Sequence, residues 1–293
     1  MNPTICKWTL SAVGVGLGFA SVVHAEELKV GKPENERLAA IERNVGGRLG
    51  VAILDTGNSR GLEYRASERF PMCSTFKFLA AAAVLRRVDL SQERLDRRIS
   101  YGPADLLTWA PVAKGHVNEG SMTLSDICAA AIDYSDNTAA NLILKSIGGP
   151  EGLTGYLRSL GDPITRLDRN EPELNTALEG DQRDTTTPAS MLHDMQVLLL
   201  GDKLSAVSRQ QLEAWLVANK TGDQRLRAGL PKDWRVGDKT GTGNNGAWGD
   251  IAIVRPPNRE PILMIVYLHG SSAPEEKLNE VFSTVGKLVM ERF

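Results

Sequence analysis

The sequence is poor in histidine, the side chain that most often binds zinc. Only four His occur among the 293 residues. Beyond the first 25 residues they lie far apart, and none has the His-x-His or His-Glu-x-x-His spacing of a zinc site. We therefore expect no metal centre in this protein. The scattered residues are His116, His193 and His269.

Cysteine is equally scarce, with three residues in the whole chain. Cys6 falls in an N-terminal segment that we expect to be removed, which leaves Cys73 and Cys128 and allows at most one disulfide. An exported protein can form such a bridge. Both residues, however, stand in apolar helical surroundings, where cysteine packs as a small hydrophobe. We favour two buried free thiols over a disulfide.

The chain also lacks an excess of either charge. It has 34 Lys and Arg against 36 Asp and Glu, a formal net charge of -2. Such a balance gives no general attraction to nucleic acid or to an anionic membrane surface. We expect a small or zwitterionic molecule as the ligand, and no nucleic-acid partner.

Long apolar runs are missing except near the N-terminus. Residues 8–23 form a glycine-interrupted apolar stretch that follows Lys7 and ends at the small-x-small sequence Val23-His24-Ala25. This pattern is typical of a secretory signal peptide over residues 1–25. A retained N-terminal anchor is the alternative, although the run is short and glycine-rich for a membrane span. We expect an exported protein, periplasmic or secreted, with no membrane attachment after cleavage.

Strand patterns occur only toward the two ends of the mature chain. Apolar residues alternate in LGVAILD, and the turn TGNSRG joins this segment to LEYR. Near the C-terminus, three strand candidates are separated by the turns GNNG and PPNRE. Sequential strands of this kind most simply pair antiparallel. The five candidates are residues 49–55, 62–65, 234–243, 248–255 and 260–270.

Helices are expected at both ends and throughout the middle. The terminal segments 36–47 and 273–293 each have one apolar stripe, and residues 67–215 have helical patterns with start signals at Thr123 and Thr187. We predict an α/β (α+β) fold with an antiparallel five-stranded sheet flanked by the terminal helices. Residues 26–66 and 216–293 would form this α/β lobe, residues 67–215 an inserted all-helical lobe, and the active site would lie between the lobes.

Ser74 and Lys77 are the first candidates for chemistry. Both lie at the start of an apolar helical run, three residues apart and so on the same face. A helix N-terminus favours a developing oxyanion, and a nearby amine can accept the serine proton. Ser74 as an ordinary helix N-cap is the alternative, because Ser-x-x-Lys is a weak motif by itself.

Two further elements follow in the chain: Ser135-Asp136-Asn137, and Lys239-Thr240-Gly241 in a predicted strand. With Ser74-x-x-Lys77 before them, they resemble the signature that serine β-lactamases and penicillin-binding proteins share. Ser135 can carry a proton to a leaving nitrogen, Asn137 can bind a substrate amide, and Lys239 with Thr240 can hold a carboxylate. Each of these residues has an ordinary structural role as its alternative. Together with Ser74 and Lys77, they favour a catalytic interpretation.

The segment Glu171-Pro172-Glu173-Leu174-Asn175 resembles the Ω loop of the class A serine β-lactamases, and the resemblance covers nearly the whole mature chain. It implies hydrolysis of the β-lactam amide of penicillin-type antibiotics without metal or organic cofactor. Ser74 would be the nucleophile, with either Lys77 or Glu171 acting through a water as its base, and Ser135 as the proton donor. Glu171 and Asn175 would activate the deacylating water, and the backbone N–H groups of Ser74 and Thr242 would form the oxyanion hole.

The same resemblance implies several supporting roles. Trp248 stands where many members have a carboxylate-binding Arg, and Arg225 matches the position from which others supply that group. Trp109 matches an aromatic residue at the cleft entrance. Arg169 and Asp184 would pair across the neck of the loop. A bridge from Cys73, found in carbapenem-hydrolysing members, would need a cysteine at Gly243, so carbapenem hydrolysis is in doubt.

Two rival functions share part of these motifs. A D,D-peptidase of the penicillin-binding group would be acylated in the same way and would deacylate slowly, but it would lack Glu171 and Asn175. A β-lactam sensor would stay acylated and would need a retained membrane span. We expect a hydrolase that acts on a small β-lactam as a monomer.

Overall fold

The computed structural model describes residue 1 and residues 32–293. The predicted signal peptide and its cleavage site therefore lie outside the described residues, apart from Met1. Within residues 32–293, no helix is both long and apolar enough to span a membrane.

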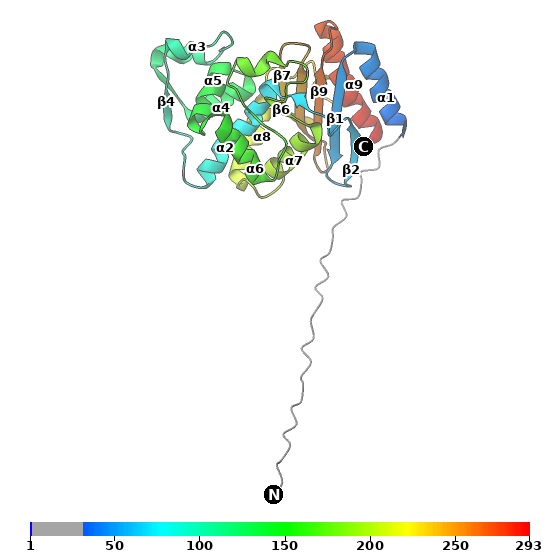
Figure 1. Cartoon of the computed structure of the whole chain (residues 1–293), viewed down its shortest axis with the longest axis horizontal. Coiled ribbons are helices and arrows are strands. Elements are labelled where there is room, and N and C mark those ends of the chain that lie inside the picture. The colour runs from blue at the N-terminus through cyan, green and yellow to red at the C-terminus, as the bar shows by residue number, and fades with distance from the viewer. Residues whose placement is uncertain (2–31) are drawn as a thin grey trace.

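The central element is a five-stranded antiparallel sheet in the order β2-β1-β9-β8-β7. It confirms the predicted sheet, because the two N-terminal strands pair with the three C-terminal ones (Figure 1). The hairpin predicted at TGNSRG joins β1 to β2. The strands are β1 (Arg48–Asp55), β2 (Arg60–Tyr64), β7 (Arg235–Thr242), β8 (Trp248–Arg255) and β9 (Ile262–His269).

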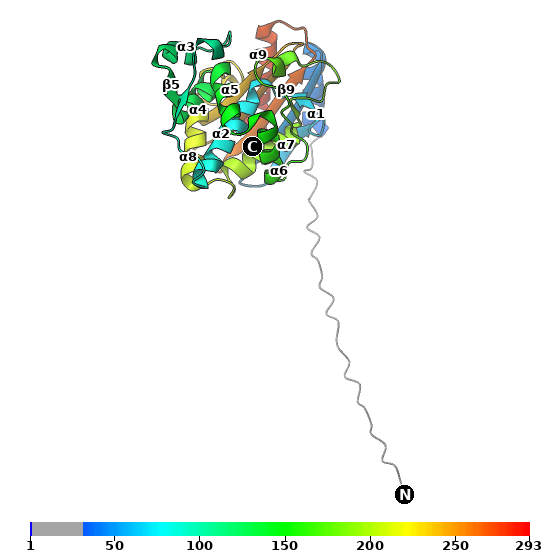
Figure 2. The ribbon, with the colours of Figure 1, turned by 60° about the vertical axis from the view of Figure 1, so that its left-hand side comes forward.

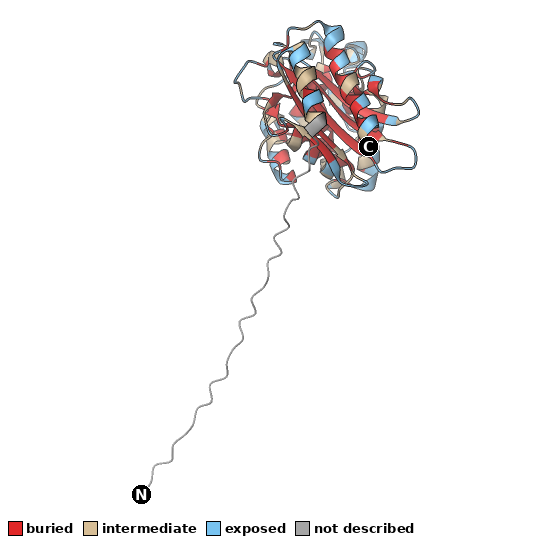
Figure 3. Ribbon diagram, turned by 90° about the vertical axis from the view of Figure 1, so that its right-hand side faces the viewer, coloured by how far each residue is buried: buried red, intermediate tan, exposed pale blue. Residues whose placement is uncertain are grey.

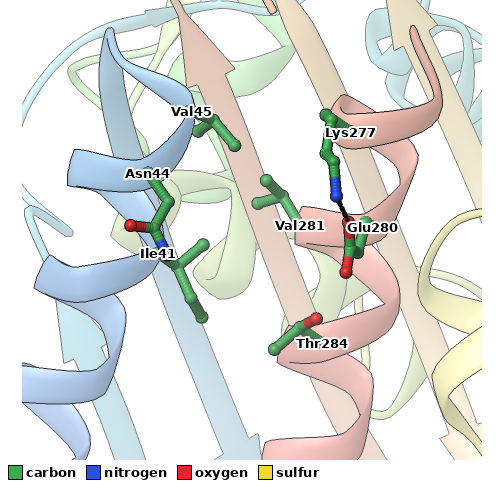
Figure 4. A pocket seen from close by; sticks show the side chains of 7 residues that line it. All are labelled: Ile41, Asn44, Val45, Lys277, Glu280, Val281 and Thr284. Atoms are coloured by element: carbon green, nitrogen blue, oxygen red, sulfur yellow. Dashed lines mark hydrogen bonds and ion pairs between the residues drawn. The ribbon is translucent and has the colours of Figure 1, made fainter. Parts of the chain in front are cut away.

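The two terminal helices, α1 (Lys32–Val45) and α9 (Glu275–Arg292), cover one face of this sheet. They lie side by side with their exposed faces outward and the buried strands behind them (Figure 3). The predicted stripe of α9 is buried against the sheet, together with Leu38 of α1. Between the helices is a groove of about 470 Å³, where Ile41 and Val45 face Val281 (Figure 4).

The helices of the middle segment lie on the opposite side of the sheet, where α7 and α8 contact its strands (Figures 1 and 2). Helix α2 is central: it contacts α4, α5, α6 and α8, and its residues 76–85 are all buried. One apolar core joins these helices to the inner face of the sheet. The helices are α2 (Phe76–Asp89), α3 (Ala113–His116), α4 (Leu124–Asp133), α5 (Asn137–Ser146), α6 (Gly149–Leu160), α7 (Pro188–Leu199) and α8 (Ala206–Ala218).

The middle segment also contains very short strands that the sequence pattern did not predict. β3 (Phe70–Pro71) pairs with β6 (Thr185–Thr186), and β4 (Arg98–Ser100) pairs with β5 (Ser121–Thr123). Segments of two or three residues are too short for an alternating pattern to be recognised. The first pair matters for function, because it fixes the chain just before Ser74 to the end of the Ω loop.

The predicted helix starts are confirmed. Thr123 Oγ1 accepts a hydrogen bond from Asp126 N, and Thr187 Oγ1 accepts one from Ser190 N with Pro188 at the first helical position. The predicted lobe boundary after residue 215 falls inside α8, so the division into lobes does not coincide with a loop there.

Candidate active site

Ser74 lies in a 3₁₀ turn, Cys73–Thr75, that leads directly into α2. The N-cap of α2 is Thr75, so Ser74 is not the cap residue. Strand β7 passes close by: a Cβ atom on Gly241 would lie 2.8 Å from Met72 O and 3.2 Å from Ser74 N. Only glycine allows this approach, which brings the backbone of the Lys-Thr-Gly element against the turn that holds Ser74.

Ser74, Lys77 and Glu171 meet at one point between α2 and the Ω loop. Ser74 Oγ lies 3.5 Å from Glu171 Oε1, and Lys77 Nζ lies 3.0 Å from the same oxygen. The Lys77 and Glu171 side chains are both fully buried. Burial lowers the pKa of Lys77, and the neighbouring Glu171 carboxylate opposes that shift.

Lys77 directs its remaining hydrogen bonds toward the turn between α4 and α5. Its Nζ donates to Ser135 O at 2.9 Å and to Asn137 Oδ1 at 2.6 Å, with a longer contact of 3.4 Å to Ser135 Oγ. An ammonium group has three hydrogen atoms. The two close acceptors and Glu171 therefore account for all three, and none is directed to Ser74.

Ser135 lies between two buried lysines. Its Oγ accepts from Lys239 Nζ at 3.1 Å, and Lys77 Nζ lies 3.4 Å from it on the other side. Its backbone is left-handed, with φ 57°, which turns the side chain between the two ammonium groups. Because the bond from Lys239 uses an oxygen lone pair, the hydroxyl proton of Ser135 is free to be donated. Burial and the Lys77 charge place the pKa of Lys239 well below its ordinary value.

Asp136, the N-cap of α5, and Asn141 within that helix stabilise this region, and we did not predict either as functional. The fully buried Asp136 caps α5 through Ala139 N and also accepts from Val112 N and Ala113 N. Asn141 makes two hydrogen bonds to the backbone of Glu171, one through Oδ1 and one through Nδ2, each 2.9 Å long. Asn137 and Asn141 share one helix face at i, i+4, and this spacing is the only sequence signal for Asn141.

The Ω loop holds Glu171 from the other side. Asn175 Nδ2 donates to Glu171 Oε2 at 2.5 Å, and the Glu171–Pro172 peptide is cis. The predicted ion pair across the neck of the loop is confirmed: Arg169 Nε lies 2.6 Å from Asp184 Oδ2. The Asp184 side chain is only 1% exposed, so this pair is buried rather than a surface pair.

Strand β7 supplies the opposite wall of the site. Thr240 and Thr242 line the cavity, whereas Lys239 is fully buried behind Ser135. Arg225 is also buried, which excludes a simply solvated arginine. Its guanidinium donates to Gly241 O, Gly249 O and Thr242 Oγ1, and it lies 4.3 Å from the centre of the Trp248 ring. Burial lowers the pKa of Arg225.

These residues surround a cavity of about 350 Å³. Trp109 stands at its edge, 56% exposed, with its indole N–H donating to Tyr134 O. The cavity brings together most of the predicted site residues and adds Thr221, which no motif indicated. Its lining residues are Ser74, Trp109, Ser135, Asn137, Asn175, Thr221, Arg225, Thr240 and Thr242.

The structure also shows where the cysteines and the potential metal ligands lie. Cys73 and Cys128 are both free and buried, as predicted. A Cβ atom on Gly243 would lie 2.6 Å from Cys73 Sγ, so these two positions are adjacent, as the family resemblance implies. Among residues 32–293, no three His, Cys, Asp or Glu side chains lie together as potential metal ligands.

Comparison with known proteins identifies the family. Residues 33–293 match the model of the Beta-lactamase enzyme family. The ancestral (GNCA) class A β-lactamase superposes with a TM-score of 0.87 and is 60% identical, covering 88% of this chain and 99% of that one. The chain is a class A β-lactamase. It is therefore an enzyme that hydrolyses β-lactams.

Two characterised β-lactamases show how far the likeness extends. β-Lactamase Toho-1 of Escherichia coli is 44% identical over 274 residues, which is 94% of this chain and 92% of Toho-1. β-Lactamase AST-1 of Nocardia asteroides is 46% identical over 286 residues, 98% of this chain and 92% of AST-1. The likeness thus spans both the sheet and the helical segment of this class A β-lactamase.

Proposed function

We propose that this protein hydrolyses penicillin-type β-lactams through an acyl-enzyme formed on Ser74. The observation that supports this most directly is the position of Glu171. Its carboxylate is within reach of Ser74 Oγ and is held by Lys77 and Asn175. A nucleophile and a base held by further groups form the general arrangement for covalent catalysis.

Glu171 is the better candidate for the base that activates Ser74. The Ser74 hydroxyl donates toward Glu171 Oε1, whereas Lys77 has its three hydrogens directed to Ser135, Asn137 and Glu171. A fully protonated amine cannot accept a proton. In this arrangement Lys77 would stabilise the Glu171 carboxylate, and Glu171 would take the proton as Ser74 Oγ bonds to the lactam carbonyl carbon.

The rest of the cycle uses residues on the other walls of the cavity. The backbone N–H groups of Ser74 and Thr242 would stabilise the oxyanion, since Gly241 lets β7 approach Ser74. Ser135 would give its free proton to the lactam nitrogen as the C–N bond breaks. Lys77 would replace that proton and would take in turn the one that Glu171 received from Ser74, so that Glu171 is again a carboxylate. Water activated by Glu171 and oriented with Asn175 would then hydrolyse the ester.

Substrate binding would use charge on one side and an apolar surface on the other. Lys239, Thr240 and Thr242 would hold the substrate carboxylate, with Arg225 acting through its hydrogen bond to Thr242. Asn137 would bind the side-chain amide, and the exposed Trp109 ring would pack on the ligand.

Mass spectrometry of the intact protein tests the mechanism. Wild-type protein mixed with benzylpenicillin is expected to show fast substrate loss and only a transient adduct. Glu171→Ala should accumulate the adduct, formed more slowly than in wild type, and Ser74→Ala should form none. Fast turnover by Glu171→Ala, or an adduct on another residue, would contradict the assignment.

The same experiment separates the two rival functions. A stable wild-type adduct with little turnover would indicate a D,D-peptidase or a β-lactam sensor of the penicillin-binding group. The Glu171–Asn175 contact supports the hydrolase. We also propose export after removal of residues 1–25, tested by N-terminal sequencing of the secreted or periplasmic protein. A monomeric state is tested by light scattering during size-exclusion chromatography.

A further inference from the structure

Three successive carbonyl groups of the Ω loop, those of residues 175–177, accept hydrogen bonds from donors next to the ends of β7 and β9. Asn244 N donates to the first, Asn245 Nδ2 to the second and His269 Nε2 to the third, each over 2.9 Å. Asn244 uses its backbone N–H, and His269 is buried. The Asn245 amide is therefore the one donor of the three that belongs to an exposed side chain.

This amide is also chemically labile, because a glycine follows it. Asn245-Gly246 is the one Asn-Gly pair among the 293 residues. Both residues have left-handed backbones, with φ 53° and 65°, in a two-residue turn that Ala247 N closes by donating to Asn244 O. Glycine has no Cβ to shield its backbone nitrogen, so this nitrogen can approach the side-chain carbon of Asn245.

Deamidation at such a pair needs only water. The backbone nitrogen of Gly246 loses its proton and bonds to Asn245 Cγ, while the Cγ–Nδ2 bond breaks and the amide nitrogen leaves with a proton as ammonia. Water then opens the cyclic imide. Breaking its bond from nitrogen to Cγ gives aspartate, and breaking the bond from nitrogen to the main-chain carbonyl carbon gives isoaspartate, which has one more carbon in the backbone. Ring closure requires Asn245 Nδ2 to leave Thr176 O, so it occurs while this contact with the Ω loop is open.

Either product removes the donor that Thr176 O now has. A carboxylate has no hydrogen to donate, and it would face a carbonyl oxygen of like partial charge. The longer backbone of isoaspartate would also move Asn244 N away from Asn175 O. Because the Asn175 side chain holds the Glu171 carboxylate, the change would reach the group that activates the deacylating water.

We propose that Asn245 is a site of spontaneous deamidation, and that this modification releases the Ω loop from the turn between β7 and β8 and slows deacylation. The kinetic part of the inference rests on the proposed function, in which Glu171 activates the water. The chain thus contains a slow chemical change of its own that lengthens the life of the acyl-enzyme.

Peptide mass spectrometry locates the modification in protein incubated at neutral and at mildly alkaline pH. Asn245 should be the first asparagine to exchange its amide for a carboxyl group, and faster at the higher pH, because the attacking nitrogen must lose its proton. Asn245→Gly tolerates the positive φ and lacks the amide, so this turn should stay unmodified in that variant. Persistence of the Asn245 amide, or earlier reaction of another asparagine, would overturn the inference.

The lifetime of the benzylpenicillin adduct tests the consequence. It should be about two- to tenfold longer in aged wild-type protein and in fresh Asn245→Asp than in fresh wild type, because one hydrogen bond to the loop is lost. Asn245→Gly should show a longer lifetime already when fresh, and ageing should not lengthen it further. Asn118→Asp adds the same charge at another exposed position and should match fresh wild type.

The outcomes separate this inference from the proposed function. If fresh wild type turns over benzylpenicillin through an adduct on Ser74, while deamidation leaves the lifetime unchanged, only the inference fails. If fresh wild type forms no such adduct, both fail. An equal lengthening by Asn118→Asp would show an effect of charge alone, and it would overturn the role given to the hydrogen bond from Asn245.

Discussion

At the residue scale, the hydrogen bonds that a side chain already makes decide what it can still do. Lys77 and Ser135 are both polar residues near the nucleophile, yet their positions differ chemically. The three hydrogens of Lys77 are directed to Ser135 O, Asn137 and Glu171, whereas the Ser135 hydroxyl accepts from Lys239 and keeps its proton for donation. The motifs identify both residues, but only their hydrogen-bond partners show that Lys77 can act as a stabilising cation and Ser135 as a proton donor.

The close approach of β7 to the nucleophile gives a prediction for Gly241. In Gly241→Ala the new Cβ would lie 2.8 Å from Met72 O, a backbone atom that cannot move aside easily. The strand should shift away from Ser74 and weaken the oxyanion hole, so kcat/KM should fall at least about tenfold. Gly115→Ala is the control, because a Cβ there has open space and should leave kcat/KM unchanged. Equal kinetics for both variants would contradict the proposed geometry.

A second prediction concerns Asp194 in α7. This residue is fully buried, next to the Asp162 carboxyl group. Burial, with the nearby Asp162 carboxylate, raises the pKa of Asp194 to about 9. The folded state therefore holds a proton that the unfolded state loses at low pH. The stability that this proton provides should fall as the pH rises from about 4 to 9.

Thermal melts from pH 5 to 10 test this prediction. The free energy of unfolding of Asp194→Asn should rise relative to wild type by up to about 1.4 kcal/mol per pH unit, and the difference should level off above pH 9. Asp202→Asn, at an exposed position, should follow the wild-type curve. Parallel curves for Asp194→Asn and wild type would show that Asp194 is ionised in the folded state.

At the scale of elements, the Ω loop is irregular, yet it is tied to the molecule at several places. Its neck is closed by Arg169 and Asp184, and β6 at its end pairs with β3 just before Ser74. Its tip is bonded to the turn between β7 and β8, where Asn244 N donates to Asn175 O. These bonds fix Glu171 on a segment that has little regular secondary structure.

Loss of the Arg169–Asp184 ion pair should therefore lower both the stability of the protein and the rate of deacylation. Arg169→Ala leaves the Asp184 carboxylate buried without its partner, which should cost about 3 kcal/mol of unfolding free energy. The adduct with benzylpenicillin should also persist longer, because Glu171 loses its support. Arg183→Ala on the same loop removes an exposed pair with Asp181 and should leave both quantities near wild type. Similar losses in the two variants would argue against a special role for the neck.

At the scale of the whole molecule, the two sequence-defined lobes share one core. Ile251, Ile265 and Tyr267 of the sheet belong to the same apolar cluster as α2 and the helices around it. The lobes thus meet through side chains that neither could leave exposed when folded alone. The cavity lies at one edge of this common core, so the positions of its walls depend on both lobes.

We expect the protein to unfold in a single cooperative transition. Far-UV circular dichroism and tryptophan fluorescence should give the same midpoint in denaturant, because loss of either lobe exposes the apolar surface of the other. Two separated transitions would mean that the shared core contributes less than the internal packing of each lobe.

Much of this protein was determined by the sequence alone. Alternating residues such as Leu49, Val51 and Ile53 predicted the strands, and spaced motifs identified Ser74, Lys77, Ser135, Glu171 and Lys239, because local periodicity and residue type survive without a structure. Tertiary structure decided the rest. The partners of Lys77, the bond from Lys239 to Ser135, and the contacts of Asn141 with Glu171 all depend on atoms brought together from distant segments. Such contacts leave no periodic signal in the chain, since they are set by how the helical segment packs against the sheet.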